Sequence, residues 1–298
     1  MNVGVIFSFG FLSIAWGLSF LFVAKVVHAF GWAAAVSFRA LIAAAALAII
    51  VMVTGRKLSF SGRLWPLIVV GATSVSGQSI GLSYATPIIG TAMAAILVAT
   101  IPLFSMLIGR IFGHERIFGV RLLGLICGLC GVILLVGFPS VGMSASFAVG
   151  CAASTFSSLC AAFGSHYASR QKNIGPLELT IGSFVTGGLI TLPLVALVPI
   201  PRSATTTDFV YLCVLAIIMS SFAYVTFFAL VAKVGATKAI SVEFLVTAVA
   251  VAVGTLLLNE RLSVVQATGA VLVVSGFLLV LDLLPQSIRK SYSRIRRS

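Results

Sequence analysis

One pattern occurs twice in the chain, as GHERIFGVRLLGLICGLCGVILLV at residues 113–136 and as LNERLSVVQATGAVLVVSGFLLVL at residues 258–281. In each copy, an acidic and a basic residue precede an apolar run that contains two spaced glycines. The residues that correspond at one constant separation are Glu115 and Glu260, Arg116 and Arg261, Gly124 and Gly269, and Gly131 and Gly276. The chain is therefore predicted to consist of two related halves.

The composition indicates whether these halves are surrounded by water or by lipid. Of the 298 residues, 60% are hydrophobic and only 8% are charged. A soluble domain has about 45–50% apolar and ~25% charged residues. A water-soluble globular protein is excluded, and so is a disordered chain, which needs low hydrophobicity. The chain is predicted to be a polytopic membrane protein.

Apolar runs of helix length divide the chain. A helix needs about 20 apolar residues to cross the hydrocarbon, and their length and lack of alternation favour helices over barrel strands. The first run has no basic segment before it, so we expect a retained helix rather than a signal peptide. The ten predicted runs are residues 5–27, 32–54, 64–85, 88–112, 119–138, 144–167, 177–199, 208–231, 237–258 and 263–284.

The basic residues predict the orientation. With ten spans both termini face one side, and of the 19 Lys and Arg residues only Lys25, Arg39, Arg202 and Arg261 fall on the other. Because basic loops stay in the cytoplasm, both termini are predicted to be cytoplasmic. This asymmetry also explains the net charge of +13 without nucleic-acid binding.

The number of spans in each half predicts the architecture. Five is odd, so the second half enters the membrane in the opposite direction. Inverted repeats of this kind build alternating-access transporters with a site near the bilayer midplane. We predict an all-α membrane protein of ten transmembrane helices, arranged as two inverted five-helix repeats around a central cavity. The repeats are residues 1–142 and 143–284, and a basic cytoplasmic tail follows at 285–298.

Motifs in the first half carry a family resemblance. The opening WGLSF at residues 16–20 precedes Lys25 and Arg39, and Pro102-Leu103-Phe104 precedes Glu115-Arg116, Gly124 and Gly131. This pattern resembles the EamA-type repeat of the drug/metabolite transporter superfamily. The second half departs from it, because Thr247 replaces the expected proline.

The resemblance implies a function. It implies a secondary transporter without a cofactor that exports small metabolites, with amino acids, including aromatic ones, as the expected substrates. It also implies the cytoplasmic membrane of a bacterium. The expected partners are the substrate and the lipid bilayer, with the chain acting as a monomer or a homodimer. Carriers of nucleotide-linked or phosphorylated substrates and lipid-facing flippase-type proteins are the alternatives.

Charges inside membrane helices are costly and indicate function. Glu243 lies in the apolar segment ISVEFLVTAVAV. It is predicted either to contact a substrate ammonium group or couple protons, or else to form a structural or gating ion pair with Lys233 or Lys238. Lys25 and Arg39 are predicted either to bind a substrate carboxylate or to reach the outer headgroups. The run boundaries place Glu243 too far across the membrane to pair with either.

Polar and aromatic side chains complete the predicted substrate site. Ser79 and Tyr224 correspond in the two halves, and Gln78 is a large polar side chain in the same helix as Ser79. Trp16 and Phe20 lie four residues apart and share a helix face, and Ser19 lies between them. Tyr84 is expected in the interfacial belt, and His166 in a belt or capping role, with a proton relay as the alternative.

Other motifs are assigned to packing. The G-x-x-x-G pairs Gly109–Gly113 and Gly124–Gly128 are predicted either to hold the fourth and fifth helices together or to mediate a dimer. Cys127 and Cys130 form a C-x-x-C without a second pair, so no metal site is expected. No nucleotide-binding loop or hydrolase elbow is present, and no enzyme is expected.

Overall fold

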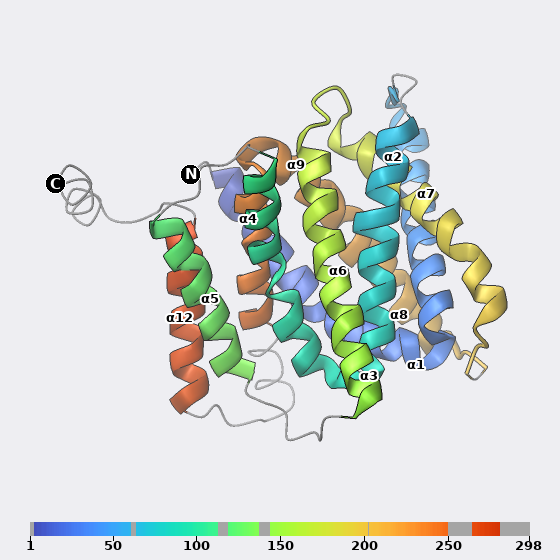
Figure 1. The fold of residues 1–298 in the computed structure, drawn as a ribbon. Coiled ribbons are helices and arrows are strands. Elements are labelled where there is room, and N and C mark those ends of the chain that lie inside the picture. Colours follow the sequence, from blue (N-terminus) through green and yellow to red (C-terminus); the bar gives the residue numbers. More distant parts are fainter. Residues whose placement is uncertain are drawn as a thin grey trace.

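The computed structural model describes residues 3–60, 64–112, 119–136, 144–201, 203–249 and 264–280. Within these ranges the chain forms helices and turns and no strand. The helices stand side by side as one bundle (Figure 1). Among the described residues, four helical stretches are long and apolar enough to cross a membrane: Val3–Thr54, Ala145–Ser169, Pro176–Leu197 and Thr206–Val234. Shorter apolar stretches of helix lie at Ile101–Ile111, Leu122–Gly131 and Val271–Val280.

α1 (Val3–Thr54) reverses direction at Gly31. Gly31 adopts φ 76° and ψ 160°, a conformation that side chains with a Cβ rarely take. A Cβ there would lie 3.3 Å from the carbonyl oxygen of Pro199, so the segment before α8 lies directly over the reversal. The predicted break between residues 27 and 32 is therefore a kink between two helical arms and needs no loop.

Two further helical stretches each contain a π-helical turn. The first comprises α2 (Leu64–Val70), η1 (Gly71–Gly77) and α3 (Gln78–Val98). The second comprises α8 (Thr206–Ala216), η2 (Ile217–Phe222) and α9 (Ala223–Val234). α8 begins with a capping box. The Thr205 side chain accepts a hydrogen bond from the backbone N–H of Asp208, and the Asp208 carboxylate accepts one from the backbone N–H of Thr205. η1 and η2 occupy corresponding positions in the two halves.

Each of these stretches meets a glycine with the same backbone conformation. Gly90, inside α3, adopts φ 80° and ψ 161°. Gly235, at the end of α9, adopts φ 87° and ψ 160°. The two glycines correspond at the separation that relates Glu115 to Glu260. The internal repeat thus extends from sequence to backbone geometry. α4 (Ile101–Ile111) follows Gly90, and α10 (Ala236–Ile240) and helical residues 242–249 follow Gly235.

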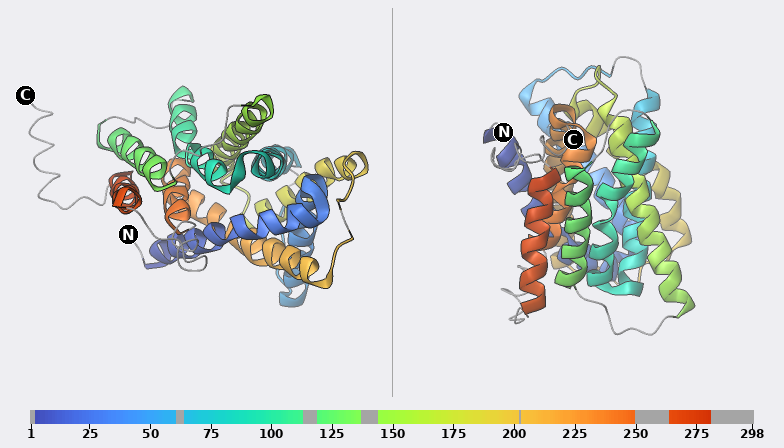
Figure 2. Two further views of the ribbon diagram at one scale, coloured as in Figure 1. Left: turned by 90° about the horizontal axis from the view of Figure 1, so that it is seen from below. Right: turned by 60° about the vertical axis from the view of Figure 1, so that its left-hand side comes forward.

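α5 (Val120–Val136) and α12 (Val264–Val280) pack against each other at one side of the bundle (Figures 1 and 2). A Cβ on Gly276 would lie 2.6 Å from the carbonyl oxygen of Gly124. A Cβ on Gly131 would lie 2.7 Å from the carbonyl oxygen of Gly269. The glycines therefore allow the two backbones to touch. The prediction that Gly124–Gly128 packs within the chain is right, but the partners are α12 and Phe244 instead of the fourth helix.

α6 (Ala145–Ser169) and α7 (Pro176–Leu197) pack against the first of the two stretches that contain a π-helical turn. α6 contacts α2, η1 and α3, and α7 contacts α2 and η1. Ser144 caps α6 by accepting a hydrogen bond from the backbone N–H of Phe147 at 3.1 Å. Glycines again allow close packing, since a Cβ on Gly81 of α3 would collide with the carbonyl oxygen of Ala153 in α6. These contacts position α3, α9 and the first arm of α1 around the centre of the bundle.

Candidate substrate cavity

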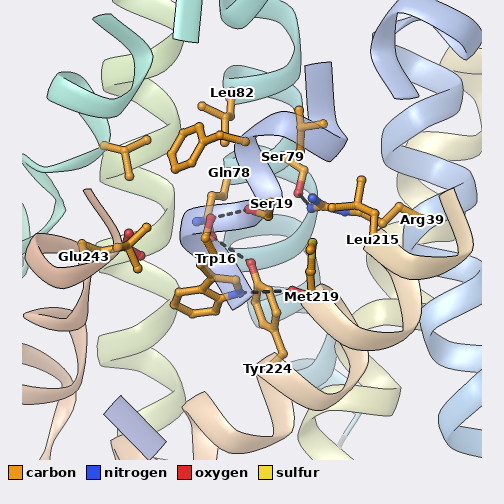
Figure 3. Close-up of a pocket in the computed structure, with 14 residues that line it drawn as sticks. Trp16, Ser19, Arg39, Gln78, Ser79, Leu82, Leu215, Met219, Tyr224 and Glu243 are labelled. Carbon is orange, nitrogen blue, oxygen red and sulfur yellow. Dashed lines mark hydrogen bonds between the residues drawn. The ribbon is translucent and has the colours of Figure 1, made fainter. Parts of the chain in front are cut away.

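A small cavity of about 60 Å³ lies between α1, α3, α9 and the helical residues that follow α10. All seven residues predicted to bind substrate line it, and Arg39 lines it as well (Figure 3). The seven are Trp16, Ser19, Phe20, Gln78, Ser79, Tyr224 and Glu243. Because they come from four separate segments, only the packing of the helices brings them together.

Arg39 faces this cavity from the second arm of α1. One Nη2 hydrogen of its guanidinium group donates to the hydroxyl oxygen of Ser79. The Nε atom is buried and has no hydrogen-bond partner among the described residues. A buried donor without a partner is costly, so the guanidinium retains hydrogen-bonding capacity at the cavity. The interpretation that Arg39 reaches the lipid headgroups does not agree with this position.

Glu243 lies on the other side of the same cavity (Figure 3). Its side chain is only 6% exposed, and no residue in the described part of the chain donates a hydrogen bond to its carboxyl group or forms an ion pair with it. Its backbone carbonyl accepts a hydrogen bond from Thr247 at 3.0 Å. The expectation that Glu243 is far across the membrane from Arg39 was wrong, because both side chains reach one central space.

Tyr224 and Gln78 are polar residues that line the cavity together with Arg39 and Glu243. The Tyr224 hydroxyl donates to the backbone oxygen of Ser74 at 3.1 Å and also lies 3.2 Å from the Gln78 amide oxygen. The Gln78 backbone oxygen accepts a hydrogen bond from Ser157 at 2.6 Å. This network joins α3, α6 and α9, so the side chains at the cavity are held by neighbouring helices.

An aromatic cluster closes one end of the cavity. The ring of Trp16 lies 5.6 Å from Tyr224 and 5.2 Å from Phe227, and its Nε1 donates to the backbone oxygen of Met219 at 3.1 Å. Tyr224 also contacts Phe228 at 5.8 Å between ring centroids. Tyr84 is absent from this cluster. It is 37% exposed and contacts Trp32, which agrees with an interfacial position.

The three lysines predicted as charge partners or gates lie away from the cavity. Lys25 is exposed, and its Nζ lies 5.4 Å from the ring centroid of Tyr211. Lys233 is exposed and Lys238 half-buried, and neither forms an ion pair with Glu243. The alternative in which Glu243 is neutralised by these lysines is therefore not what the structure contains.

His166 belongs to a buried polar cluster that sequence reasoning missed. Its Nε2 lies 2.9 Å from the hydroxyl oxygen of Ser105, which lies 3.1 Å from that of Thr237. All three residues are buried, so the prediction that His166 lies in the interfacial belt was wrong. The apolar cavity residues Val98, Met219 and Val246 were also missed, because nothing distinguishes them in sequence from core residues.

Comparison with known proteins gives the family. The EamA-like transporter family matches the chain twice, over residues 3–137 and 147–282. The chain belongs to the EamA-like transporter family. Like other members, this EamA-like chain is a multi-pass membrane transporter built from two repeats, and it is not an enzyme.

Individual relatives of this EamA-like transporter are distant. The chain is 26% identical over 250 residues to Protein PecM of Dickeya dadantii (strain 3937), covering 84% of each chain. It is 24% identical over 268 residues to an uncharacterized transporter of Archaeoglobus fulgidus, covering 89% of this chain and 94% of the relative. A solved crystal structure superposes with a TM-score of 0.80 at 17% identity, over 95% of this chain and 98% of the other. This structural likeness establishes the fold alone.

Proposed function

We propose that this EamA-like transporter exports small zwitterionic metabolites, in particular amino acids including aromatic ones, across a bacterial cytoplasmic membrane. The observation that supports this is the pair of opposite charges at one cavity, Arg39 on one side and Glu243 on the other. An amino acid carries a carboxylate and an ammonium group on adjacent carbons, so the two side chains match its two charges.

Each part of the cavity fits one part of such a substrate. The planar guanidinium of Arg39 can bind a carboxylate through two parallel N–H donors. Glu243 can accept hydrogen bonds from an ammonium group, and the hydroxyls of Ser19 and Ser79 offer further polar contacts. Trp16 and Phe20 provide an apolar surface for the side chain of the substrate.

The cavity volume supports alternating access. About 60 Å³ is far below the roughly 300–1,000 Å³ of typical ligand pockets. The helices around it must therefore move apart to admit an amino acid. Ten spans in two inverted repeats would allow that movement on either side in turn. The antiparallel contacts of α5 and α12, in which Gly124 meets Gly276 and Gly131 meets Gly269, agree with such a symmetry.

Uptake into proteoliposomes of the purified chain tests this proposal. Labelled phenylalanine, threonine, methionine and glutamate would be offered with and without a pH gradient. Saturable uptake that excess unlabelled solute blocks is the expected result. Competition by phosphorylated sugars but not by amino acids would instead favour the alternative of a phosphorylated substrate. No uptake into vesicles that contain folded protein would contradict the amino-acid proposal.

A further inference from the structure

A second, larger space lies at the end of the bundle where α1 reverses. It has a volume of about 660 Å³ and is lined by Val27, Gly31 and Trp32 of α1, by Thr86 and Gly90 of α3, and by Pro199. We call it the vestibule. Among its lining residues the titratable side chain is His28, which is exposed, and the remaining surface is mainly apolar.

The vestibule continues the two helix faces that form the central cavity. In α1 the cavity is lined by Phe20 and Val23, and the vestibule by Val27 and Gly31. Residues three and four positions apart lie on one face of a helix. The first arm of α1 thus presents a single stripe to both spaces.

The same continuity holds in α3. Gln78 and Leu82 line the cavity, and Thr86 and Gly90 line the vestibule. Both helices therefore pass from one space to the other within one helical turn, which rises about 5.4 Å. Val23, 5% exposed, and the half-buried Leu82 are the last cavity residues before this turn. On α1 and α3, one layer of apolar side chains therefore lies between the two spaces.

The opposite end of the cavity is closed much more thickly. The layer next to the cavity at this end is the aromatic cluster, in which Trp16 contacts Tyr224 and Phe227. Ile101 and Ile240 line a void of only about 10 Å³ together with this cluster. One turn beyond them in sequence come Ser105 and Thr237, and Ser105 is hydrogen-bonded both to Thr237 and to His166. Opening that end requires separating several packed layers and a buried polar cluster, whereas opening toward the vestibule requires moving one layer.

We propose that the vestibule is a second binding site on the transport path, and that Val23 and Leu82 form the barrier between it and the cavity. Its ligand is the apolar part of a small amphipathic solute, because the described lining offers an apolar surface and no carboxylate, lysine or arginine. This inference rests on the proposed function for the identity of the solute, but the position of the barrier does not.

Thiol labelling tests the barrier without any substrate. In a variant lacking the five native cysteines, Ser19→Cys would report on the cavity and His28→Cys on the vestibule, using a water-soluble methanethiosulfonate. We expect His28→Cys to react rapidly and Ser19→Cys slowly. Leu82→Ala should accelerate labelling of Ser19→Cys at least tenfold, whereas Leu159→Ala, an exposed control on α6, should leave it slow. Equal rates for both cysteines, or no response to Leu82→Ala, would overturn the proposal.

A transport measurement tests the ligand. Ala24→Trp would fill part of the vestibule, and Ala152→Trp, at an exposed position on α6, is the matched control. We expect Ala24→Trp to lower phenylalanine uptake at least tenfold and threonine uptake less. Equal effects of the two tryptophans would refute the apolar site. If no amino acid is transported at all, the proposed function fails while the labelling result still decides the barrier.

Discussion

Arg39 has five N–H donors, and in the described structure one of them meets Ser79 while its Nε meets no acceptor. Arg39→Lys keeps the charge but removes the planar fork. We expect KM for phenylalanine uptake to rise about tenfold, equivalent to ~1.4 kcal/mol. Lys25→Gln is the control, because Lys25 is exposed and outside the cavity. Equal KM values for the two variants would contradict a carboxylate-binding role for Arg39.

Glu243 is the other residue whose role can be isolated. If its carboxyl group couples protons to transport, Glu243→Gln should abolish accumulation driven by a pH gradient yet spare exchange of labelled for unlabelled solute. Glutamine keeps the shape of the side chain and one acceptor oxygen, but it has an NH2 donor in place of the second oxygen and cannot carry the proton. Uptake and exchange would be measured in the same vesicles. An unchanged pH dependence would remove Glu243 from proton coupling.

For single residues, the sequence predicts only in part which charged side chains line the cavity. The cost of a charge in a membrane singles out Arg39 and Glu243, and both line the cavity. The same rule also singles out Lys25, which points outward. The difference depends on the rotation of each helix, and α1 is apolar around its whole circumference, so its pattern does not indicate which face is inward.

The pair α5 and α12 has a backbone contact that tolerates no side chain. A Cβ on Gly276 would lie 2.5 Å from the backbone nitrogen of Gly128. Gly276→Ala should therefore destabilise the protein by about 1–3 kcal/mol, as overpacking does, and lower the midpoint of thermal unfolding in detergent. Gly10→Ala is the control, because nothing lies within 4 Å of that position. A stable Gly276→Ala protein would mean that the two helices separate readily.

The elements were predicted better than their partners. Run lengths predict helices and place breaks at the positions of Gly31 and Gly235, whereas Gly90 falls inside the predicted run 88–112. They do not reveal that these breaks are kinks, nor that η1 and η2 are π-helical. The G-x-x-x-G spacing identifies a close contact but not its partner, since any small-residue face fits another. For Gly124 the partner lies in the other half of the chain.

The orientation of the whole molecule is testable with two cysteines. Exposed Lys57 follows the end of α1 at Thr54, and Ile200, 49% exposed, follows Pro199, which contacts α1 at Gly31, the other end of its second arm. In intact cells an impermeant maleimide should label Ile200→Cys but not Lys57→Cys in the chain without native cysteines. Membrane disruption, the control, should expose both. The reverse pattern would place the termini outside.

The presence of two related halves was the most predictable feature of the molecule. Two short motifs at one separation predict the repeat, which the matched glycine conformations and the family comparison bear out. The cavity was harder to predict, because its walls come from four segments whose proximity is a property of packing. The correspondence of Ser79 and Tyr224 in the two halves did predict that both line the cavity, because the repeat brings equivalent helices to the centre.

The reversal of α1 at Gly31 affects how the protein can be handled. Both arms are continuously helical up to this buried glycine, and the segment containing Pro199 and Pro201 covers it. A protease acting on that face finds no extended peptide between the arms, and an inserted epitope would break the helical pair. Between Leu197 and Thr206 the backbone leaves the helices. A tag or a cleavage site should therefore stay out of the segment around Pro199, because that segment covers Gly31 and lines the vestibule.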